Sequence, residues 1–543
     1  MSQDESASEA HRLYRAVPGH EPRHGAMQTD SARSDDRHPV NGVVAPASTG
    51  VMYVSERAAA NGWSPLNEGV STGRSLTTSR SKTEDLTLWR WGCSFFVRFF
   101  TSGPTSSVKY TQGPFQHTGT QPLTTIWVEF LQGQGAPEVG DLPGAPPRPQ
   151  VIDMSKMASS PSPRRTSHHG ADVHEYAPTT GVRELRAAVA HLYNETHRKG
   201  KTSQYTADNV AIVPGGRAGL TRVASIIGEV YVSYQVPEYT AYDQMLSSFR
   251  KLVPIPSMLD EEDAYHLNID KLKKNIKNQG LSVVVASNPR NPTGQVIHGE
   301  ELEQLVDLGR QGTTIILDEF YSMYQYELGE GAVVSAAKYV EDVEKDSVII
   351  IDGLTKNWRL PGWRVAWVIG PKALVTALGS VGGYLDGGAN HVLQVAAIPL
   401  MEPSRVEQDR LTLERHFKAK RDHVLERLER MGLPVKHKPT STFYIWLDLS
   451  CLPAPLDGGL VFFEECLKER VIVTPGIFFD LNPAVRRNLH DSPCHHFVRL
   501  SYGPPLEEID RGLDAIERLL NRVRKAIKGG DSLFDHVDKD LKQ

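Results

Sequence analysis

Cysteine is scarce in this sequence, and the few cysteines are scattered. Four occur in 543 residues, and no two of them form a CxxC pair, so the sequence predicts neither a structural zinc site nor a disulfide framework. The adjacent histidines at 168–169 and 495–496 point to opposite sides of an extended chain, which argues against a histidine metal site. We expect reduced thiols, no bound metal ion and a cytoplasmic location.

Long apolar runs and a strong net charge are also absent. The most apolar stretch near the amino terminus, residues 86–100, contains two arginines and is too short to span a bilayer. The formal net charge of −5 provides no general attraction to nucleic acid. We therefore expect neither a membrane span nor a nucleic-acid partner.

Composition and patterning divide the chain into segments. Residues up to about 120 are rich in Ser, Thr, Gly, Arg and Asp with little periodic apolar content, which predicts disorder. From residue 176 onward helical and strand patterns alternate, which predicts an α/β fold: a mainly parallel sheet flanked by helices, then a smaller α+β carboxyl-terminal domain. The expected segments are a disordered extension at 1–120, a poorly defined arm at 121–175, a large domain at 176–408, a small domain at 409–525 and a tail at 526–543. The expected helices are 182–197 and 406–431, and the expected strands of the small domain are 442–449, 470–476 and the segment around residue 499.

Three short, apolar segments of the large domain predict buried parallel strands. These segments are 281–286, 315–317 and 347–351. Asn291 follows the first, Asp318 and Glu319 follow the second, and Lys356 follows the third. Because open α/β sheets bind ligands at the carboxyl ends of their strands, we expect these side chains to share one site.

Two further motifs accompany these strand ends. Arg364 stands eight residues after Lys356 in the run DGLTKNWRLPGWR. Upstream, NVAIVPGGRAGL has the pattern of a strand, a glycine turn and a helix start, so the backbone amides of Gly216, Arg217 and Ala218 can cradle a phosphate.

In combination these motifs resemble the class I/II aminotransferases, the pyridoxal-phosphate enzymes of fold type I. The resemblance runs from Tyr176 to the helix that ends near residue 520, roughly two thirds of the chain. It implies pyridoxal 5'-phosphate as cofactor, an α-amino acid and a 2-oxo acid as substrates, and a role in amino acid metabolism as a biosynthetic enzyme. It also implies a homodimer, because Tyr176 corresponds to a residue that reaches the phosphate of the neighbouring subunit.

The resemblance assigns roles to the residues at the strand ends. Lys356 would form the aldimine with the cofactor, and Asp318 would hold the pyridine nitrogen. Asn291 and Tyr321 would donate hydrogen bonds to the phenolic oxygen of the cofactor. Arg499, together with Asn291, would bind the α-carboxylate of the substrate.

The remaining cofactor contacts would lie around the ring and the phosphate. Tyr239 would stack on the pyridine, and Thr355, Arg364 and the glycine turn would hold the phosphate. The family usually has a second hydroxyl residue three positions before the lysine, where this chain has Gly353. We expect the side chain of Arg217 to face solvent rather than to replace that hydroxyl.

Each assignment has a physical reason. A buried carboxylate keeps a ring nitrogen protonated through a charge-assisted hydrogen bond, so Asp318 is suited to that position. Lys356, once released by the amine of the substrate, is a free base beside the α-carbon. The planar fork of Arg499 can bind a carboxylate with two parallel hydrogen bonds.

The predicted function is amino-group transfer in two half-reactions, with neutral, apolar or aromatic amino acids as donors and 2-oxoglutarate or pyruvate as acceptor. A lyase or cyclase resembling aminocyclopropane-carboxylate synthase or a carbon-sulfur lyase would keep every cofactor residue. A winged-helix regulator with an aminotransferase-like domain would need a preceding DNA-binding domain, which the aperiodic amino terminus does not supply. A catalytically inactive scaffold is disfavoured by the presence of Lys356 and Asp318.

Overall fold

The computed structural model describes residues 135–148, 173–483, 485, 487 and 491–529. The predicted disordered extension, the apolar stretch at 86–100, most of the arm and nearly all of the tail lie outside these residues. So does the region in which a DNA-binding domain would have to lie. These predictions therefore stay untested.

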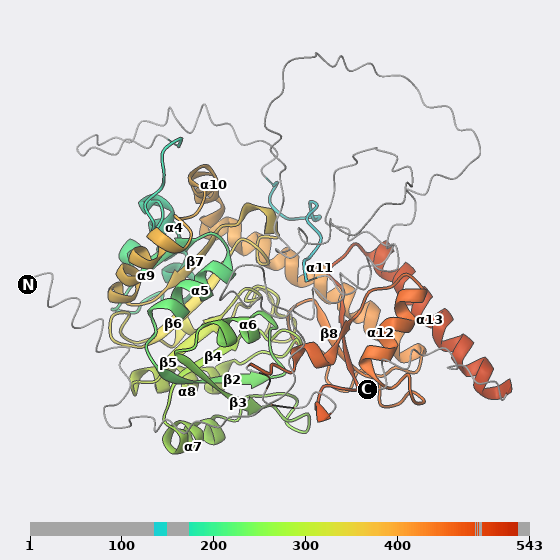
Figure 1. Cartoon of the computed structure of the whole chain (residues 1–543). Helices are drawn as coiled ribbons and strands as arrows, with labels where there is room; N and C mark the ends of the chain where they lie inside the picture. The colour runs from blue at the N-terminus through green and yellow to red at the C-terminus, as the bar shows by residue number, and fades with distance from the viewer. Residues whose placement is uncertain (1–134, 149–172, 484, 486, 488–490, 530–543) are drawn as a thin grey trace, which may run out of the picture.

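A seven-stranded sheet forms the centre of the large domain, in the order β1-β7-β6-β5-β4-β2-β3 (Figure 1). The strands are β1 (Val210–Val213), β2 (Val230–Val236), β3 (Leu252–Met258), β4 (Leu281–Ser287), β5 (Thr314–Asp318), β6 (Val348–Gly353) and β7 (Ala366–Ile369). Strands β2 to β6 pair in parallel, whereas β7 is antiparallel to both β6 and β1. The prediction of a mainly parallel sheet is confirmed.

Helices pack along the sheet. They are α4 (Arg183–His197), α5 (Gly216–Ile226), α6 (Ala241–Ser248), α7 (Ile269–Gln279), α8 (Gly299–Arg310), α9 (Lys372–Leu385) and α10 (His391–Ala397). The apolar face predicted for the first helix is buried, since Leu185, Val189 and Leu192 are at most 4% exposed. Burial of these side chains fixes α4 against β1.

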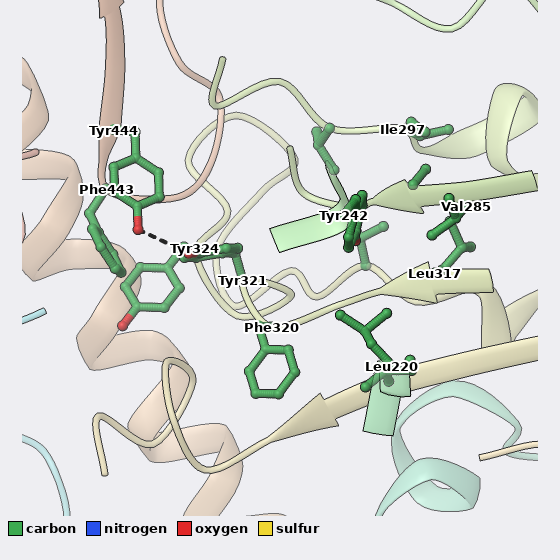
Figure 2. Packing of buried hydrophobic residues seen from close by; sticks show 14 of the residues in the cluster. Leu220, Tyr242, Val285, Ile297, Leu317, Phe320, Tyr321, Tyr324, Phe443 and Tyr444 are labelled. Carbon is green, nitrogen blue, oxygen red and sulfur yellow. Dashed lines mark hydrogen bonds between the residues drawn. The ribbon is translucent and has the colours of Figure 1, made fainter. Parts of the chain in front are cut away.

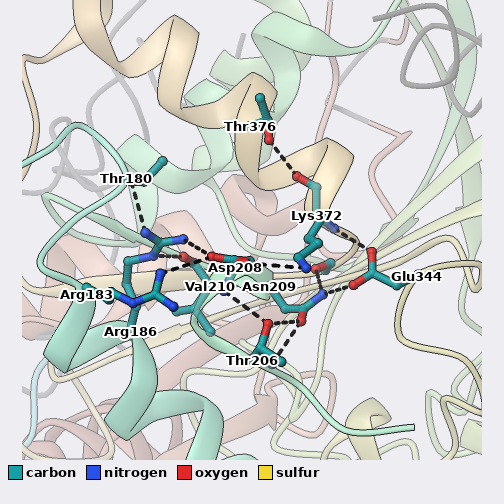
Figure 3. A network of polar contacts seen from close by, with 11 residues as sticks. Thr180, Arg183, Arg186, Thr206, Asp208, Asn209, Val210, Glu344, Lys372 and Thr376 are labelled. Carbon is teal, nitrogen blue, oxygen red and sulfur yellow. Dashed lines mark hydrogen bonds and ion pairs between the residues drawn. The ribbon is translucent and has the colours of Figure 1, made fainter. Parts of the chain in front are cut away.

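A polar network fastens α4 to the beginnings of β1 and α9 (Figure 3). The carboxylate of Asp208 lies 3.5 Å from the guanidinium of Arg183, 3.7 Å from that of Arg186 and 3.4 Å from the ammonium group of Lys372. The amide of Asn209 donates to the Glu344 carboxylate at 2.9 Å. Because exposed ion pairs each contribute less than about 1 kcal/mol, this network serves to align the elements more than to stabilise them.

The small domain contains a three-stranded antiparallel sheet in the order β8-β10-β9. Its elements are α11 (Pro403–Arg430), β8 (Tyr444–Asp448), α12 (Gly459–Lys468), β9 (Thr474–Pro475), β10 (Phe497–Ser501) and α13 (Leu506–Gly529). The strand predicted at 470–476 is only two residues long, and a 3-10 helix begins directly after Pro475. The proposed domain boundary at 408/409 falls within α11, which runs from one domain to the other (Figure 1).

Among the residues that the structure describes, no helix is long and apolar enough to cross a membrane.

Candidate active site

The carboxyl ends of β4, β5 and β6 lie side by side in the sheet. Ser287 at the end of β4 is opposite Asp318 at the end of β5, and Asp318 is opposite Ile351 in β6. Asn291 and Lys356 lie in the turns that follow β4 and β6. The structure therefore brings the polar residues that follow the three predicted strands to one edge of the sheet.

Asp318 is buried at this edge, with 7% of its surface exposed. The Tyr242 hydroxyl donates a hydrogen bond to Oδ2 of Asp318 at 3.2 Å. Burial, followed by the nearby carboxyl of Glu238, raises the pKa of Asp318 to about 7, although Tyr242 and Lys356 oppose the shift. Such a carboxylate needs a cationic partner to ionise fully at neutral pH.

We expect Asp318→Asn to stabilise the ligand-free protein at pH 8. The folded-state pKa of Asp318 is above its unfolded value of 3.8, so its stabilising contribution is complete below about pH 4 and is lost as pH rises to about 7. This difference corresponds to roughly 4 kcal/mol at most, and asparagine, which does not ionise, avoids the loss. Thermal unfolding at pH 6 and pH 8 checks the prediction, and an advantage of the variant that does not grow with pH would contradict it.

Lys356 lies in the turn after β6, and its Nζ donates to the backbone carbonyl of Gly135. Burial lowers the pKa of Lys356 to about 7, with further contributions from the positive charges of Arg499, Arg217 and Arg364. A large fraction of this amine is therefore neutral near pH 7. A neutral amine can act as a nucleophile and as a base.

The segment at 135–148 lies against this lysine, and sequence reasoning assigned no site residue to it. Arg359, three residues after Lys356, donates to the carbonyl oxygens of Glu138 at 2.9 Å and Gly140 at 2.6 Å. The Glu138 carboxylate accepts from Lys420 of α11 at 2.8 Å. Nothing in the local sequence around Gly135 distinguishes it from other glycines, since its position depends on these long-range contacts.

Arg499 reaches the site from the small domain. It is 3% exposed in the middle of β10, and its Nη1 donates to Oδ1 of Asn291 at 2.8 Å. Its guanidinium carbon lies 4.2 Å from the ring centre of Tyr444 and 5.0 Å from that of Phe479. The two rings restrict the plane of the guanidinium, which is the group best suited to bind a carboxylate.

Tyr321 and Tyr444 form a pair of buried phenols. Their hydroxyl oxygens are 2.9 Å apart, and Figure 2 shows this bond joining the turn after β5 to the start of β8. Sequence reasoning selected Tyr321 but treated Tyr444 only as part of a strand, because alternation predicts a buried ring without indicating its partner.

The glycine turn between β1 and α5 brings the backbone close to a cation. Gly215 has a φ of +94°, and a side chain there would overlap the guanidinium of Arg364. Gly216 and Arg217 begin α5, so their amides lie in the first helical turn, and the Ala218 amide donates to the Gly215 carbonyl at 3.1 Å. Helix amides and a guanidinium that converge in this way form a site for an anion such as phosphate.

The side chain of Arg217 is exposed, as expected, but it also contacts the site. Its Nε donates to the Tyr239 hydroxyl at 3.2 Å, and its charge contributes to the lowered pKa values of Lys356 and Arg364. Tyr239 is partly buried and lies edge-on to Tyr242, with ring centres 5.6 Å apart. Arg217 therefore adds positive charge at the glycine turn.

Three positions remain from the sequence-based assignment: Thr355, Gly353 and Tyr176. Thr355 is partly buried next to Lys356. Gly353 ends β6 opposite Ala366 of β7, where a β-carbon would approach the Ala366 Cα to 2.5 Å, so the structure has no room there for the hydroxyl residue of the family pattern. Tyr176 is 92% exposed and lies on the surface of this chain.

Comparison with known proteins agrees with this arrangement. The model of the family "Aminotransferase class I and II" matches residues 140–516. A probable aspartate/prephenate aminotransferase of Aquifex aeolicus is 26% identical over 354 residues, which cover 64% of this chain and 84% of the relative. Aromatic-amino-acid aminotransferase 2 of Thermococcus litoralis is 26% identical over 356 residues, covering 64% and 85%. These matches favour amino-group transfer over the lyase or cyclase alternative.

Solved structures show the same fold. An aromatic aminotransferase from Pyrococcus horikoshii superposes with a TM-score of 0.59 at 24% identity, covering 73% of this chain and 96% of that chain. An aspartate aminotransferase mutant from Thermus thermophilus gives 0.57 at 22% identity, covering 72% and 91%. With a family match that extends over most of the described residues, this chain belongs to the class I and II aminotransferases and is a transaminase.

Proposed function

We propose that the protein uses pyridoxal 5'-phosphate to transfer an amino group from an α-amino acid to a 2-oxo acid by a ping-pong mechanism. The observation that carries the proposal is the position of Lys356. Its amine, with a pKa of about 7, lies among Asp318, Arg499 and the cationic glycine turn. An amine, a buried acid and an anion site at one sheet edge fit the aldehyde, the ring nitrogen and the phosphate of this cofactor.

The cofactor, when bound, supplies an electron sink for the charge that develops at the α-carbon of the substrate. Asp318 would hold a protonated ring nitrogen, whose positive charge would allow this acid to ionise fully. Asn291 and Tyr321 would donate to the phenolic oxygen, and Tyr239 would pack on the ring. Arg364, Thr355 and the amides of Gly216 and Arg217 would hold the phosphate, with Ala218 closing the turn through its own hydrogen bond.

Lys356 would also accept and transfer the proton that leaves the substrate. Its Nζ lies in the turn after β6, and its depressed pKa keeps part of it free to accept a proton from the substrate near pH 7. Arg499 would bind the α-carboxylate and so fix the distance between the α-carbon and this amine. In the structure Nζ contacts the Gly135 carbonyl, so we propose that Gly135 lies at the entrance of the substrate position.

The aromatic surroundings of Arg499 support a neutral, apolar or aromatic amino acid as donor, with 2-oxoglutarate or pyruvate as acceptor. Tyr444 and Phe479 flank its guanidinium, and an apolar side chain can pack against such rings. The names of the relatives, which include aspartate, prephenate and aromatic amino acids, define the panel of substrates to test first.

We further propose a cytoplasmic homodimer in which Tyr176 contacts the phosphate of the partner subunit. The exposure of Tyr176 on the surface of its own chain supports this role. The division into a large domain at 176–408 and a small domain at 409–525 is part of the same proposal, because the site lies between β5 and β10 and so needs both parts.

We expect each half-reaction to run alone. A donor amino acid mixed with the cofactor-loaded enzyme, without a 2-oxo acid, should release one equivalent of 2-oxo acid per site and stop. Adding 2-oxoglutarate or pyruvate should restart the reaction with parallel-line, ping-pong kinetics. Product analysis measures this outcome. Continuous release of ammonia, a thiol or a cyclised product in the absence of acceptor would contradict amino transfer and favour a lyase or cyclase.

A further inference from the structure

Tyr444 connects two groups that come from different domains. Its hydroxyl is 2.9 Å from that of Tyr321, and its ring lies under the guanidinium of Arg499 at 4.2 Å. Tyr444 is fully buried, and Tyr321 is 6% exposed. A buried phenol that contacts both groups can influence both at once.

The register of the small sheet explains how Tyr444 reaches Arg499. Tyr444 pairs with Ser501, and Trp446 pairs with Arg499, in the antiparallel ladder of β8 and β10. Tyr444 and Arg499 are therefore diagonal neighbours on one face of the sheet, where side chains are close enough to stack. The stacking follows from the strand pairing and does not depend on a loop.

Each of the two phenols has a single proton, and this limits which hydrogen bonds the pair can donate. Burial raises the pKa of both hydroxyls, so each is a neutral phenol with one proton at physiological pH. Only one of them can donate to the other. If Tyr321 donated to Tyr444, Tyr321 would have no proton left for a second acceptor.

The position of Arg499 over the ring of Tyr444 favours one direction of the bond. A cation over the face of an aromatic ring withdraws electron density and makes the hydroxyl of that ring a better donor. The positive charge of Arg499 lowers the pKa of both phenols against the effect of burial, but its guanidinium is stacked on the ring of Tyr444. Because either hydroxyl can donate at this distance, the stacked guanidinium favours Tyr444 as the donor, which would leave the proton of Tyr321 available for another acceptor.

We infer that Tyr444 is a positioning residue with two roles. Its hydroxyl donates to the Tyr321 hydroxyl and so directs the proton of Tyr321 towards the phenolic oxygen of the cofactor. Its ring holds the plane of the Arg499 guanidinium for the substrate carboxylate. This inference rests on the proposed function. It adds that Tyr321, the cofactor contact in the large domain, is coupled through Tyr444 to Arg499, the substrate contact in the small domain.

The test is the pH midpoint of the visible absorption band of the cofactor-loaded enzyme. Donation by Tyr321 to the phenolic oxygen stabilises the deprotonated form of the chromophore, and a donor to Tyr321 strengthens that bond cooperatively. We expect Tyr444→Phe to raise the midpoint by about half a pH unit. Tyr321→Phe should raise it further, and adding Tyr444→Phe to that variant should cause no additional shift.

A matched control is Tyr502→Phe. Tyr502 is a fully buried tyrosine of the same domain, and its hydroxyl donates to the Thr442 carbonyl at 3.2 Å. The control removes a comparable buried hydroxyl and should leave the midpoint unchanged. A merely structural role for Tyr444 would make the two variants alike. Tyr444→Leu removes the ring as well as the hydroxyl, and we expect it to raise KM for the amino acid more than it lowers kcat, because the plane of Arg499 is then less restricted.

A second variant tests the direction of the bond without removing it. Incorporation of 3-chlorotyrosine at position 444 makes the hydroxyl more acidic and should shift the midpoint downward, opposite to Tyr444→Phe. An unchanged midpoint in both variants, or shifts of Tyr444→Phe and Tyr321→Phe that simply add, would overturn the inference. Failure of the proposed function would look different, because the wild-type protein with pyridoxal phosphate would then show no borohydride-sensitive band at all.

Discussion

Replacing Lys356 with alanine is expected to reduce turnover by at least about 10⁴-fold, because one side chain supplies both the covalent anchor and the base. The yellow band of the loaded protein should also lose its sensitivity to borohydride. Reduction followed by peptide mass spectrometry measures the anchor, and steady-state kinetics measure the rate.

Lys372→Ala is the matched control for this prediction. Lys372 is half exposed at the start of α9, 3.4 Å from Asp208, and far in the fold from the strand ends that form the site. We expect its removal to leave both readouts unchanged. Recovery of the reduced adduct at a different lysine in Lys356→Ala would show that the anchor has been assigned to the wrong residue.

Replacing Asp318 with alanine is expected to leave the cofactor bound but to slow proton abstraction by roughly 100- to 4,000-fold. Removing one partner of a buried ion pair costs about 3–5 kcal/mol, and each 1.4 kcal/mol in the barrier is a factor of ten in rate. Phosphate and ring contacts remain in the variant, so binding should persist. Single-turnover absorbance measurements with a donor amino acid follow this step directly.

Glu319→Gln separates the two adjacent acids. Successive residues at a strand end point in opposite directions, and Glu319 accepts from the Ala336 amide at 2.8 Å, with burial raising its pKa to about 8. Its carboxyl is therefore mostly neutral already, and glutamine should replace it with little loss of rate. A larger rate loss in Glu319→Gln than in Asp318→Ala would assign the ring nitrogen to Glu319.

Much of the fold and part of the site could be predicted from the sequence, because local patterns encode them. Runs of Val and Ile identified β4, β5 and β6, and the polar residues directly after each run marked the sheet edge where Asn291, Asp318 and Lys356 meet. The amphipathic spacing of α4 likewise identified its buried face. These features depend on residues that are neighbours in the sequence.

The other site residues depend on contacts between distant segments. Gly135 reaches Lys356 across 221 positions of the chain, and Tyr444 meets Tyr321 across 123. The exposure of Arg217 was predicted correctly, but its bond to Tyr239 was not, because a residue pattern does not indicate which way a long side chain turns. Strand β9 is shorter than predicted at both ends, because its pairing with β10 begins only at Thr474 and a 3-10 helix begins directly after Pro475.

The close packing of Gly353 against β7 limits how this enzyme can be redesigned. A β-carbon at position 353 would lie 2.5 Å from both the Cα and the Cβ of Ala366 and 2.9 Å from the Val365 carbonyl oxygen. Since two of these three obstacles are backbone atoms, no second substitution at position 366 would make room for a serine. A library that seeks tighter cofactor retention should therefore leave position 353 fixed and vary Arg217 and Thr355, where side chains can change without separating two strands.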